Sequence, residues 1–320
     1  MIHAKHCDFE LDADVERAAG YAPAVRAVAI PRRADRAFVA VPHRAAQATA
    51  QDTGNAGHDF RVLVERARFG KAPRVPKART EKASLAAARA DLRALADPAR
   101  AKGVAAFFKT RPGEYGEGDV FLGVRVPELR KVARARAALT LRDLAALLRS
   151  RFHEERLLAL MVLVTQYEKG DGAERQERFA FYLEHLACVN NWDLVDASAA
   201  PIVGAHVLAS RDRRLLPRLA GSKVLWERRV AMVATYAFIR AGESATTFEI
   251  AKLLLRDEHD LMHKAVGWML REVGKRVSAP ALRGFLEAHA ANMPRTALRY
   301  AIERFPEAER RRWLGVKRRT

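Results

Sequence analysis

The clearest pattern along the chain is a series of apolar positions with helical spacing, running from about residue 84 to the last residues. Two examples are the sets Leu141-Leu144-Leu147-Leu148 and Phe248-Ala251-Leu254-Leu255. This spacing puts the apolar side chains on one face of an α-helix. No segment of this region alternates with the period of a β-strand. The region is therefore predicted to be all-α, with about twelve to fourteen helices given usual helix and loop lengths.

Five of the helical stretches resemble one another and recur at a nearly constant distance. They begin at Glu154, Trp192, Trp226, Met262 and Arg295, which are 38, 34, 36 and 33 residues apart. This period is typical of paired-helix repeats, because a single helical hairpin cannot bury its apolar face and must stack on its neighbours. Turn-forming segments such as residues 169–172 and 220–222 separate the stretches. The pattern predicts an α-helical solenoid.

Residues 1–83 have a different composition. Their short apolar patches are interrupted by proline and glycine, and the segment ends in a basic run over residues 71–82. We expect a mostly disordered basic arm; the alternatives are a small, poorly packed subdomain or a start codon assigned too early. Acidic residues near the first methionine argue against a signal or transit peptide. The predicted division is an arm over 1–83 and a helical domain over 84–320.

Charge and cysteine content narrow the class of partner. The chain has 57 Lys and Arg against 38 Asp and Glu, a formal net charge of +19, and a pI near 10.5. Nucleic acid is therefore the leading expected partner, and an acidic membrane surface comes second. No apolar stretch has membrane-spanning length. The two cysteines, Cys7 and Cys188, offer no disulfide framework, which indicates a reducing, cytoplasmic location.

Basic residues recur in the first turn of the aligned stretches. Helix starts carry unpaired N–H groups and a partial positive charge, so this placement predicts a row of phosphate contacts along one edge of the solenoid. For any single member, the alternative is a solvated side chain or one that pairs with a nearby acid such as Glu227. The members are Arg156, Arg228 or Arg229, Lys264 and Arg295.

Trp192 and Asp196 are an unusual pair in so basic a protein. They are four residues apart and lie side by side on a helix. Asp196 would repel a polyanion, whereas both residues would attract a cation carried within that polyanion. Asp193 is expected to point away and to act as a helix-start residue, and Trp268 lies among other polar residues. The sequence contains no HExxH or CxxC motif and no glycine-rich phosphate loop, so neither a metal nor a cofactor is expected.

Four motifs together resemble the AlkD-type DNA alkylation repair enzymes, which are HEAT-like-repeat alkylpurine DNA glycosylases. They are Phe-Leu-Gly-Val-x-x-Pro-x-Leu-Arg at 121–130, Trp-Asp-x-Val-Asp at 192–196, Trp-x-Arg-Arg-x-Ala at 226–231 and Ala-Val-Gly-Trp-x-Leu-Arg-Glu at 265–272. The resemblance covers roughly residues 84–315. It implies a right-handed superhelix whose concave face holds duplex DNA, and monofunctional release of 3-methyladenine and 7-methylguanine in base excision repair.

The resemblance also implies which residues form the site. Asp196, Trp192 and Trp268 would lie in the catalytic cleft, with Arg229 as the nearby cationic contact, although Arg228 is one position away. This agrees with the chemistry, because alkylation at N3 or N7 makes the purine a good leaving group and a carboxylate can then stabilise the cationic sugar. We expect a monomer without a membrane partner. The alternatives are a noncatalytic helical-repeat scaffold that binds DNA or protein, and a basic protein that binds RNA or a membrane surface.

Overall fold

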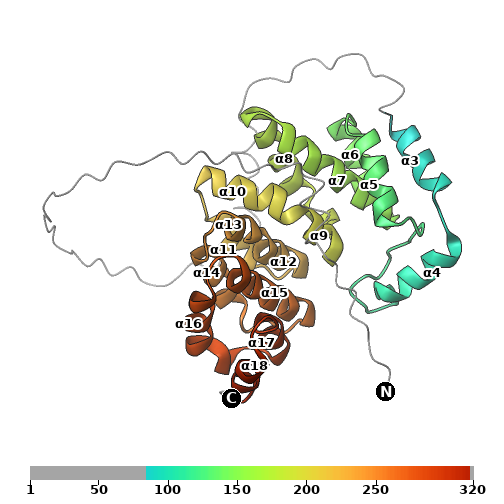
Figure 1. Cartoon of the computed structure of the whole chain (residues 1–320). Coiled ribbons are helices and arrows are strands. Elements are labelled where there is room, and N and C mark those ends of the chain that lie inside the picture. Colours follow the sequence, from blue (N-terminus) through green and yellow to red (C-terminus); the bar gives the residue numbers. More distant parts are fainter. Residues whose placement is uncertain (1–83, 318–320) are drawn as a thin grey trace, which may run out of the picture. The chain divides into compact units, whose positions relative to one another are not determined.

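The structure is a computed structural model that describes residues 84–317 (Figure 1). Within that range the only β-type pairing is an isolated bridge between Val120 and Phe152, and the rest of the regular structure is helical. The all-α prediction is therefore confirmed for these residues. The predicted arm lies outside the described range and stays a prediction.

The helices follow one another with short connections. They are α3 (Leu85–Ala94), α4 (Pro98–Phe107), α5 (Val126–Ala135), α6 (Leu141–Leu148), α7 (His153–Lys169), α8 (Gly172–Glu184), α9 (Trp192–Ser198), α10 (Ala205–Ser210), α11 (Leu215–Ala220), α12 (Leu225–Ala234), α13 (Tyr236–Arg240), α14 (Ala245–Leu254), α15 (Asp260–Arg276), α16 (Ala279–His289), α17 (Arg295–Ala301) and α18 (Glu307–Leu314). Short 3₁₀ turns cover Leu186–Cys188 and Ala290–Asn292, and a π-helical segment, η3, covers Ala199–Gly204.

The five aligned sequence stretches fall on α7, α9, α12, α15 and α17. Each of these helices contacts the next one in the series. The helices α6, α8, α11, α14 and α16 precede them in the chain, so each repeat is a pair of helices. Consecutive colours in Figure 1 follow this order from α6 to α17. The predicted helical-repeat fold is confirmed, and it places α9, α12 and α15 side by side.

The described residues contain sixteen α-helical segments, which is more than the sequence suggested. Two near-continuous pairs explain the difference. Helices α9 and α10 are joined by the π-helical segment that contains Pro201, and α12 and α13 are separated only by Thr235. Proline lacks the N–H that an α-helix needs at an interior position. Periodicity alone does not detect such local changes in winding, which are often found at functional sites.

Local sequence explains where several of the helices begin. The side chains of Ser84, Thr140, Asp171 and Ser278 each accept a hydrogen bond from a backbone N–H in the first turn of the helix that follows. Such caps satisfy donors that would otherwise have no partner. In α5, Pro127 occupies the first turn, where its missing N–H has no cost and its fixed φ suits the helix.

Two glycines allow neighbouring helices to approach closely. A Cβ atom at Gly204 would lie 2.1 Å from the backbone oxygen of Ala234, and one at Gly267 would lie 2.4 Å from that of Ala297. Any larger residue would force these helices apart. The first contact fixes η3 against α12, and the second fixes α15 against α17. One continuous apolar core runs through the described repeats. Among residues 84–317, no helix is long and apolar enough to cross a membrane.

Candidate active site

Asp196 and Arg229 form the central ion pair of the candidate site. Asn191 caps α9 by accepting a hydrogen bond from the Trp192 N–H, and the helix places Asp196 one turn further on. The Arg229 guanidinium donates from Nε to one Asp196 oxygen at 2.9 Å and from Nη2 to the other at 2.8 Å. Its Nη1 donates to the Leu261 carbonyl oxygen at 2.7 Å. Arg229 therefore links α9, α12 and α15 at one point.

Burial and the neighbouring Arg229 charge have opposite effects on the pKa of Asp196. Burial raises the pKa of the carboxyl above its usual range, because the charged form is poorly solvated, and Asp193 adds to this effect. The Arg229 guanidinium opposes both by its charge and its hydrogen bonds, but burial is the larger effect and the pKa of Asp196 stays above its usual range. The Asp196 side chain keeps 15 % of its surface exposed, whereas that of Arg229 keeps only 6 %. A carboxylate in a fixed orientation therefore reaches the surface while its cationic partner stays behind it.

Trp192 belongs to an aromatic group that comes mainly from the segment around the end of α4. The Phe108 ring stacks on the Trp192 indole, with centroids 5.0 Å apart and an interplanar angle of 8°. Phe107 meets the same indole edge-on at 6.0 Å and is 54 % exposed. Phe108 thus supports one face of the half-buried indole, and Phe107 extends the aromatic surface towards solvent. Sequence analysis did not identify either phenylalanine as part of the site.

Tyr115 joins this aromatic group to the next repeats. Burial raises the pKa of the Tyr115 hydroxyl, and this is opposed by a hydrogen bond with the Trp192 side chain and by the charge of Lys264. The Tyr115 ring also meets Trp226, at the start of α12, at 6.2 Å. Tyr115 therefore contacts Trp192 on α9 and Trp226 on α12 and is close enough to α15 for the Lys264 charge to act on it.

Trp268 lies on α15 and is partly buried against the core. Its ring centroid is 6.5 Å from that of Tyr236 on α13. Trp268 is seven residues beyond Leu261, which accepts the Arg229 hydrogen bond. Seven residues are about two helical turns, so the two positions share one side of α15 at a separation of roughly 10 Å. Trp268 therefore lies on the side of α15 that contacts Arg229, the partner of Asp196.

A buried polar network lies beneath Trp192, and sequence analysis missed it. His153, the first residue of α7, has its Nδ1 3.1 Å from an Asp119 oxygen and its Nε2 2.7 Å from an Asp193 oxygen. Asp119 also accepts hydrogen bonds from Asn191 at 2.9 Å and from Arg156 at 2.5 Å. Asp193 is therefore more than a helix-start residue, because its carboxylate binds His153.

The charges of this network stabilise one another. Burial disfavours a charged imidazole, but Asp193 and Asp119 outweigh that effect and raise the pKa of His153 to about 9. Burial similarly tends to raise the pKa of Asp119, yet its hydrogen bond with His153 and the Arg156 charge lower it below the usual range. The network therefore contains an imidazolium between two carboxylates at neutral pH.

Comparisons with known proteins agree with this architecture. A family model described as "DNA alkylation repair enzyme" matches residues 88–305, which is more than half of the chain. The chain belongs to the DNA alkylation repair enzyme family. Its role therefore lies in the repair of alkylated DNA, and its substrate is DNA.

A solved structure shares the fold. The protein described as "Predicted DNA alkylation repair enzyme from Enterococcus faecalis" has a TM-score of 0.53 and 17 % sequence identity, over 66 % of this chain and 97 % of that one. At this level of identity the likeness shows the helical-repeat fold alone. A comparison with curated proteins gave no match.

Two of the arginines expected to bind phosphate in this DNA repair protein are buried. Arg156 is only 5 % exposed, and its guanidinium bonds to Asp119 and to the Ser150 carbonyl oxygen at 2.9 Å. Its placement in the phosphate row was wrong, because α7 turns it inward. Arg229 is equally buried by its contact with Asp196. The open question between the two adjacent arginines is settled, since Arg229 faces Asp196 and Arg228 instead pairs with Asp257 at 2.6 Å.

The remaining expected DNA contacts are more accessible but have internal partners. The Lys264 side chain is 41 % exposed and lies 2.8 Å from Asp260 on the same helix. Arg295 donates to the carbonyl oxygens of Leu314 and Val316, at and just beyond the end of α18. Both could approach DNA only by giving up or sharing these contacts.

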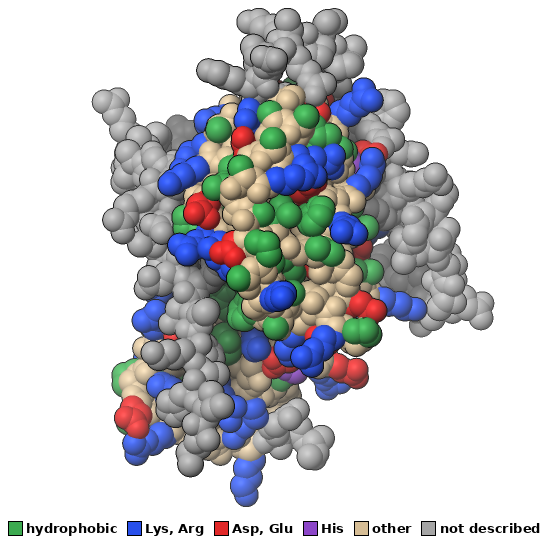
Figure 2. All heavy atoms as spheres, turned by 90° about the vertical axis from the view of Figure 1, so that its right-hand side faces the viewer, with side chains coloured by type: hydrophobic (Ala, Val, Ile, Leu, Met, Phe, Trp, Pro, Cys, Tyr) green, Lys and Arg blue, Asp and Glu red, His purple; other side chains and the backbone are tan. Residues whose placement is uncertain are grey.

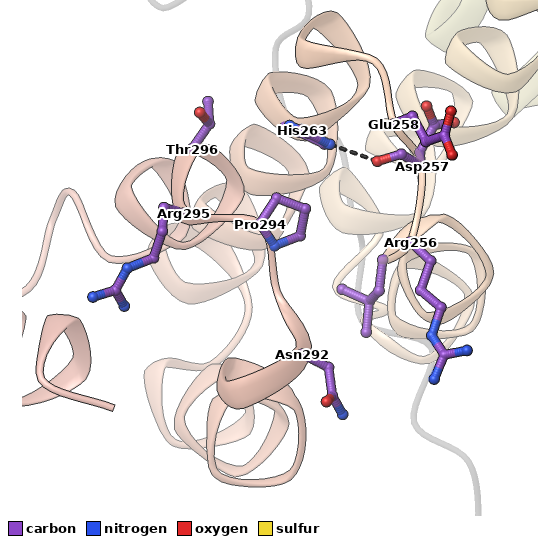
Figure 3. A pocket seen from close by; sticks show the side chains of 9 residues that line it. Arg256, Asp257, Glu258, His263, Asn292, Pro294, Arg295 and Thr296 are labelled. Atoms are coloured by element: carbon purple, nitrogen blue, oxygen red, sulfur yellow. Dashed lines mark hydrogen bonds between the residues drawn. The ribbon is translucent and has the colours of Figure 1, made fainter. Parts of the chain in front are cut away.

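Arg295 also lines a pocket between the α14–α15 connection and the start of α17 (Figure 3). Asp257 and Glu258 lie on one side of this pocket, where the Asp257 carbonyl oxygen is 2.5 Å from His263 Nε2. Arg295 and Arg256 lie on other sides. A pocket lined by both carboxylates and guanidinium groups is poorly suited to a phosphate, and it contains none of the catalytic candidates.

Cationic side chains do not form one uninterrupted row on the face shown in Figure 2. Lys and Arg are spread among hydrophobic side chains, and acidic side chains accompany several of them. On this face, charge is distributed rather than concentrated. Among residues 84–317, no group of three or more His, Cys, Asp or Glu side chains is arranged to hold a metal ion.

Proposed function

We propose that the protein is a monofunctional DNA glycosylase that hydrolyses the N-glycosidic bond of cationic alkylpurines, such as 3-methyladenine and 7-methylguanine, in duplex DNA. The observation that carries this proposal is the Asp196 carboxylate, held by two hydrogen bonds from Arg229 and one helical turn from Trp192. Membership of a DNA alkylation repair family supplies the substrate class. The geometry supplies a fixed negative charge beside an aromatic surface.

The carboxylate suits this reaction because the leaving group is already activated. When the C1′–N bond of a cationic purine breaks, both bonding electrons stay with the base and neutralise it, so no general acid has to protonate it. Water then adds to C1′ and loses a proton. Asp196 would stabilise the positive charge on the sugar in the transition state and orient the water.

Arg229 serves this reaction by fixing Asp196, not by binding DNA. Its guanidinium is buried, and each of its three nitrogens donates to Asp196 or to the Leu261 carbonyl oxygen. The bidentate contact fixes the plane of the carboxylate. It also favours the charged form against the effect of burial. We assign Arg229 as a positioning residue for the catalytic acid group.

The aromatic side chains would select for positive charge on the lesion. Indole faces attract cations by electrostatic interaction with the ring, and Trp192 is presented on the rigid support of Phe108. Trp268 would provide a second such contact from α15. The exposed Phe107 would stack on a base next to the lesion, since aromatic rings provide stacking surfaces for any nucleobase. A neutral lesion would lose the cation–π part of this attraction.

Phosphate binding would come from accessible cations near the site. Lys264 is the strongest candidate, because its side chain is exposed and its charge acts on Tyr115 beside Trp192. Arg228 and Arg295 would contribute if their internal contacts are shared with phosphate oxygens.

The decisive assay measures base release from methylated duplex DNA. The wild-type protein should liberate free 7-methylguanine and 3-methyladenine and leave an intact apurinic site. Retention of the methylated bases, with tight DNA binding, would instead indicate a noncatalytic DNA-binding scaffold.

A further inference from the structure

The surroundings of His153 favour a positive charge on its ring. Each of its two ring nitrogens lies within hydrogen-bond distance of a different carboxylate, at 3.1 Å for Asp119 and 2.7 Å for Asp193. A neutral imidazole has one N–H and could donate to only one of them, whereas an imidazolium donates to both. The His153 side chain is 2 % exposed, so water cannot easily replace either partner.

The two carboxylates belong to different parts of the fold. Asp119 lies in the segment between α4 and α5, which also supplies Phe108 and Tyr115, and Asp193 lies in the first turn of α9 beside Trp192. His153 at the start of α7 therefore bridges the aromatic segment to the helix that carries the proposed catalytic residues. Arg156 and Asn191 also bond to Asp119 and reinforce this connection. The Arg156 guanidinium faces His153 as well, with its Nη2 3.5 Å from Nδ1, and its charge opposes the imidazolium less strongly than the two carboxylates favour it.

Ring contacts also connect His153 to Trp192. The Phe108 centroid is 5.0 Å from the His153 ring and 5.0 Å from the Trp192 indole. Phe121 makes the second ring contact of His153, with the two ring centroids 4.7 Å apart. Phe108 thus lies between His153 and Trp192, so a displacement of the imidazole would reach the indole through one intervening ring.

We propose that His153 is a positioning residue for the base-release reaction: its imidazolium holds Asp119 and Asp193 together and thereby fixes the Phe108–Trp192 stack beside Asp196. This inference rests on the proposed function for its catalytic consequence. A positioning role differs from a purely stabilising one, because loss of His153 should then change the environment of Trp192 and the rate of base release that depends on Trp192.

The position of Trp192 can be tested without DNA. The full chain has four tryptophans, so labelling with 5-fluorotryptophan gives four ¹⁹F NMR signals, and the Trp192→Phe variant identifies the relevant one. His153→Gln should shift or broaden the Trp192 signal and leave that of Trp313, buried in α18, in place. An unmoved Trp192 signal would overturn the proposal.

Asp193→Asn provides a second, milder route to the same test. It keeps His153 and its contact with Asp119 but removes the negative charge on the α9 side, and it should also move the Trp192 signal. This variant decides the question if His153→Gln does not fold. His206→Gln is the matched control, because His206 is a partly buried histidine that stacks on Phe179 at 3.8 Å and lies outside the network. It should leave the Trp192 signal unchanged.

A double-mutant cycle then tests the catalytic consequence. His153→Gln should slow single-turnover release of 7-methylguanine by about tenfold or more, since small misplacements of catalytic groups can cost up to about 10² in rate. In a Trp192→Ala background the same change should cost less than about twofold, because residues that act through one another are not additive. Binding of undamaged duplex should not change.

The outcomes separate the two claims. Equal losses in both backgrounds would show that His153 acts independently of Trp192 and would overturn the positioning role. If the wild-type protein releases no base, the proposed function fails, whereas the fluorine signals still decide whether His153 holds Trp192 in place.

Discussion

At the scale of single residues, Asp196 and Arg229, whose proximity was expected from the family resemblance, differ in exposure and in proposed role. Asp196 is partly exposed and oriented, and Arg229 is buried behind it. The sequence could not choose between Arg228 and Arg229 because neighbouring helix positions differ by about 100° in direction, and nothing in the composition fixes the rotation of α12. The structure fixes it, because Arg228 pairs with Asp257 and Arg229 with Asp196.

The tryptophans should matter most for charged lesions. Trp192→Ala and Trp268→Ala should each slow release of cationic 7-methylguanine by roughly 2- to 30-fold, which corresponds to a cation–π contribution of about 0.5–2 kcal/mol. Release of an uncharged lesion should fall less. Single-turnover kinetics on two duplexes that differ only in the lesion measure this ratio. Equal losses on both lesions would indicate that the indoles contribute shape and not cation recognition.

Phe107 offers a test of the exposed part of the aromatic surface. Phe107→Ala should weaken binding of lesion-containing duplex by about tenfold, since stacking of one base on an aromatic ring contributes roughly 1–3 kcal/mol. Thermal stability should change little because the ring is already 54 % exposed. Leu253→Ala on α14 is a matched control, with 56 % exposure and no aromatic neighbour in the site. If both variants bind equally well, Phe107 is not a DNA contact.

At the scale of helices, periodicity predicted most of the framework. The five aligned stretches lie on five helices that neighbour one another in series. Capping residues such as Ser278 lie where helices begin. The network around His153 was not predictable in this way. Asn191 and Asp119 are 72 residues apart in the chain, and contacts between distant segments leave no periodic signal. Arg156 was misplaced for the same reason, since only its distant partner Asp119 explains why it is buried.

The charged state of His153 should appear in the pH dependence of stability. Its pKa rises from about 6.5 in the unfolded chain to about 9 in the folded protein. The folded state therefore binds more protons between these values, and its advantage is complete below pH 6.5 and lost as the pH rises through about 9. Relative to His153→Gln, the wild-type protein should lose on the order of 2–3 kcal/mol of unfolding free energy across this window.

Denaturant unfolding at several pH values measures this difference. His206→Gln is the control, because burial lowers the pKa of His206 and its contribution is instead lost as the pH falls below about 6.5. A constant difference between wild type and His153→Gln from pH 6.5 to 9 would show that His153 is neutral in the folded protein.

At the scale of the whole molecule, the net charge of +19 should make DNA binding strongly dependent on salt. Each neutralised phosphate contributes a slope of about −0.9 to the plot of log affinity against log salt concentration. Lys264→Gln should reduce the magnitude of the slope by about one contact, because Lys264 is exposed beside the site. Lys252→Gln, an exposed change on α14, is the control. An unaltered slope for Lys264→Gln would exclude it as a phosphate contact.

If the Asp196 carboxylate drives release of a cationic base, its charge is essential, and single-turnover release from methylated duplex by Asp196→Asn measures that requirement. Asparagine keeps the size of the side chain and removes its charge. The matched control is Asp257→Asn, which removes the carboxylate charge from the neighbouring Asp257–Arg228 pair and leaves the Asp196–Arg229 pair in place. We expect Asp196→Asn to slow release by about 10²–10³, with DNA binding preserved or tightened, whereas Asp257→Asn should retain most activity. Unchanged release by Asp196→Asn, or an equal loss in both variants, would contradict this expectation.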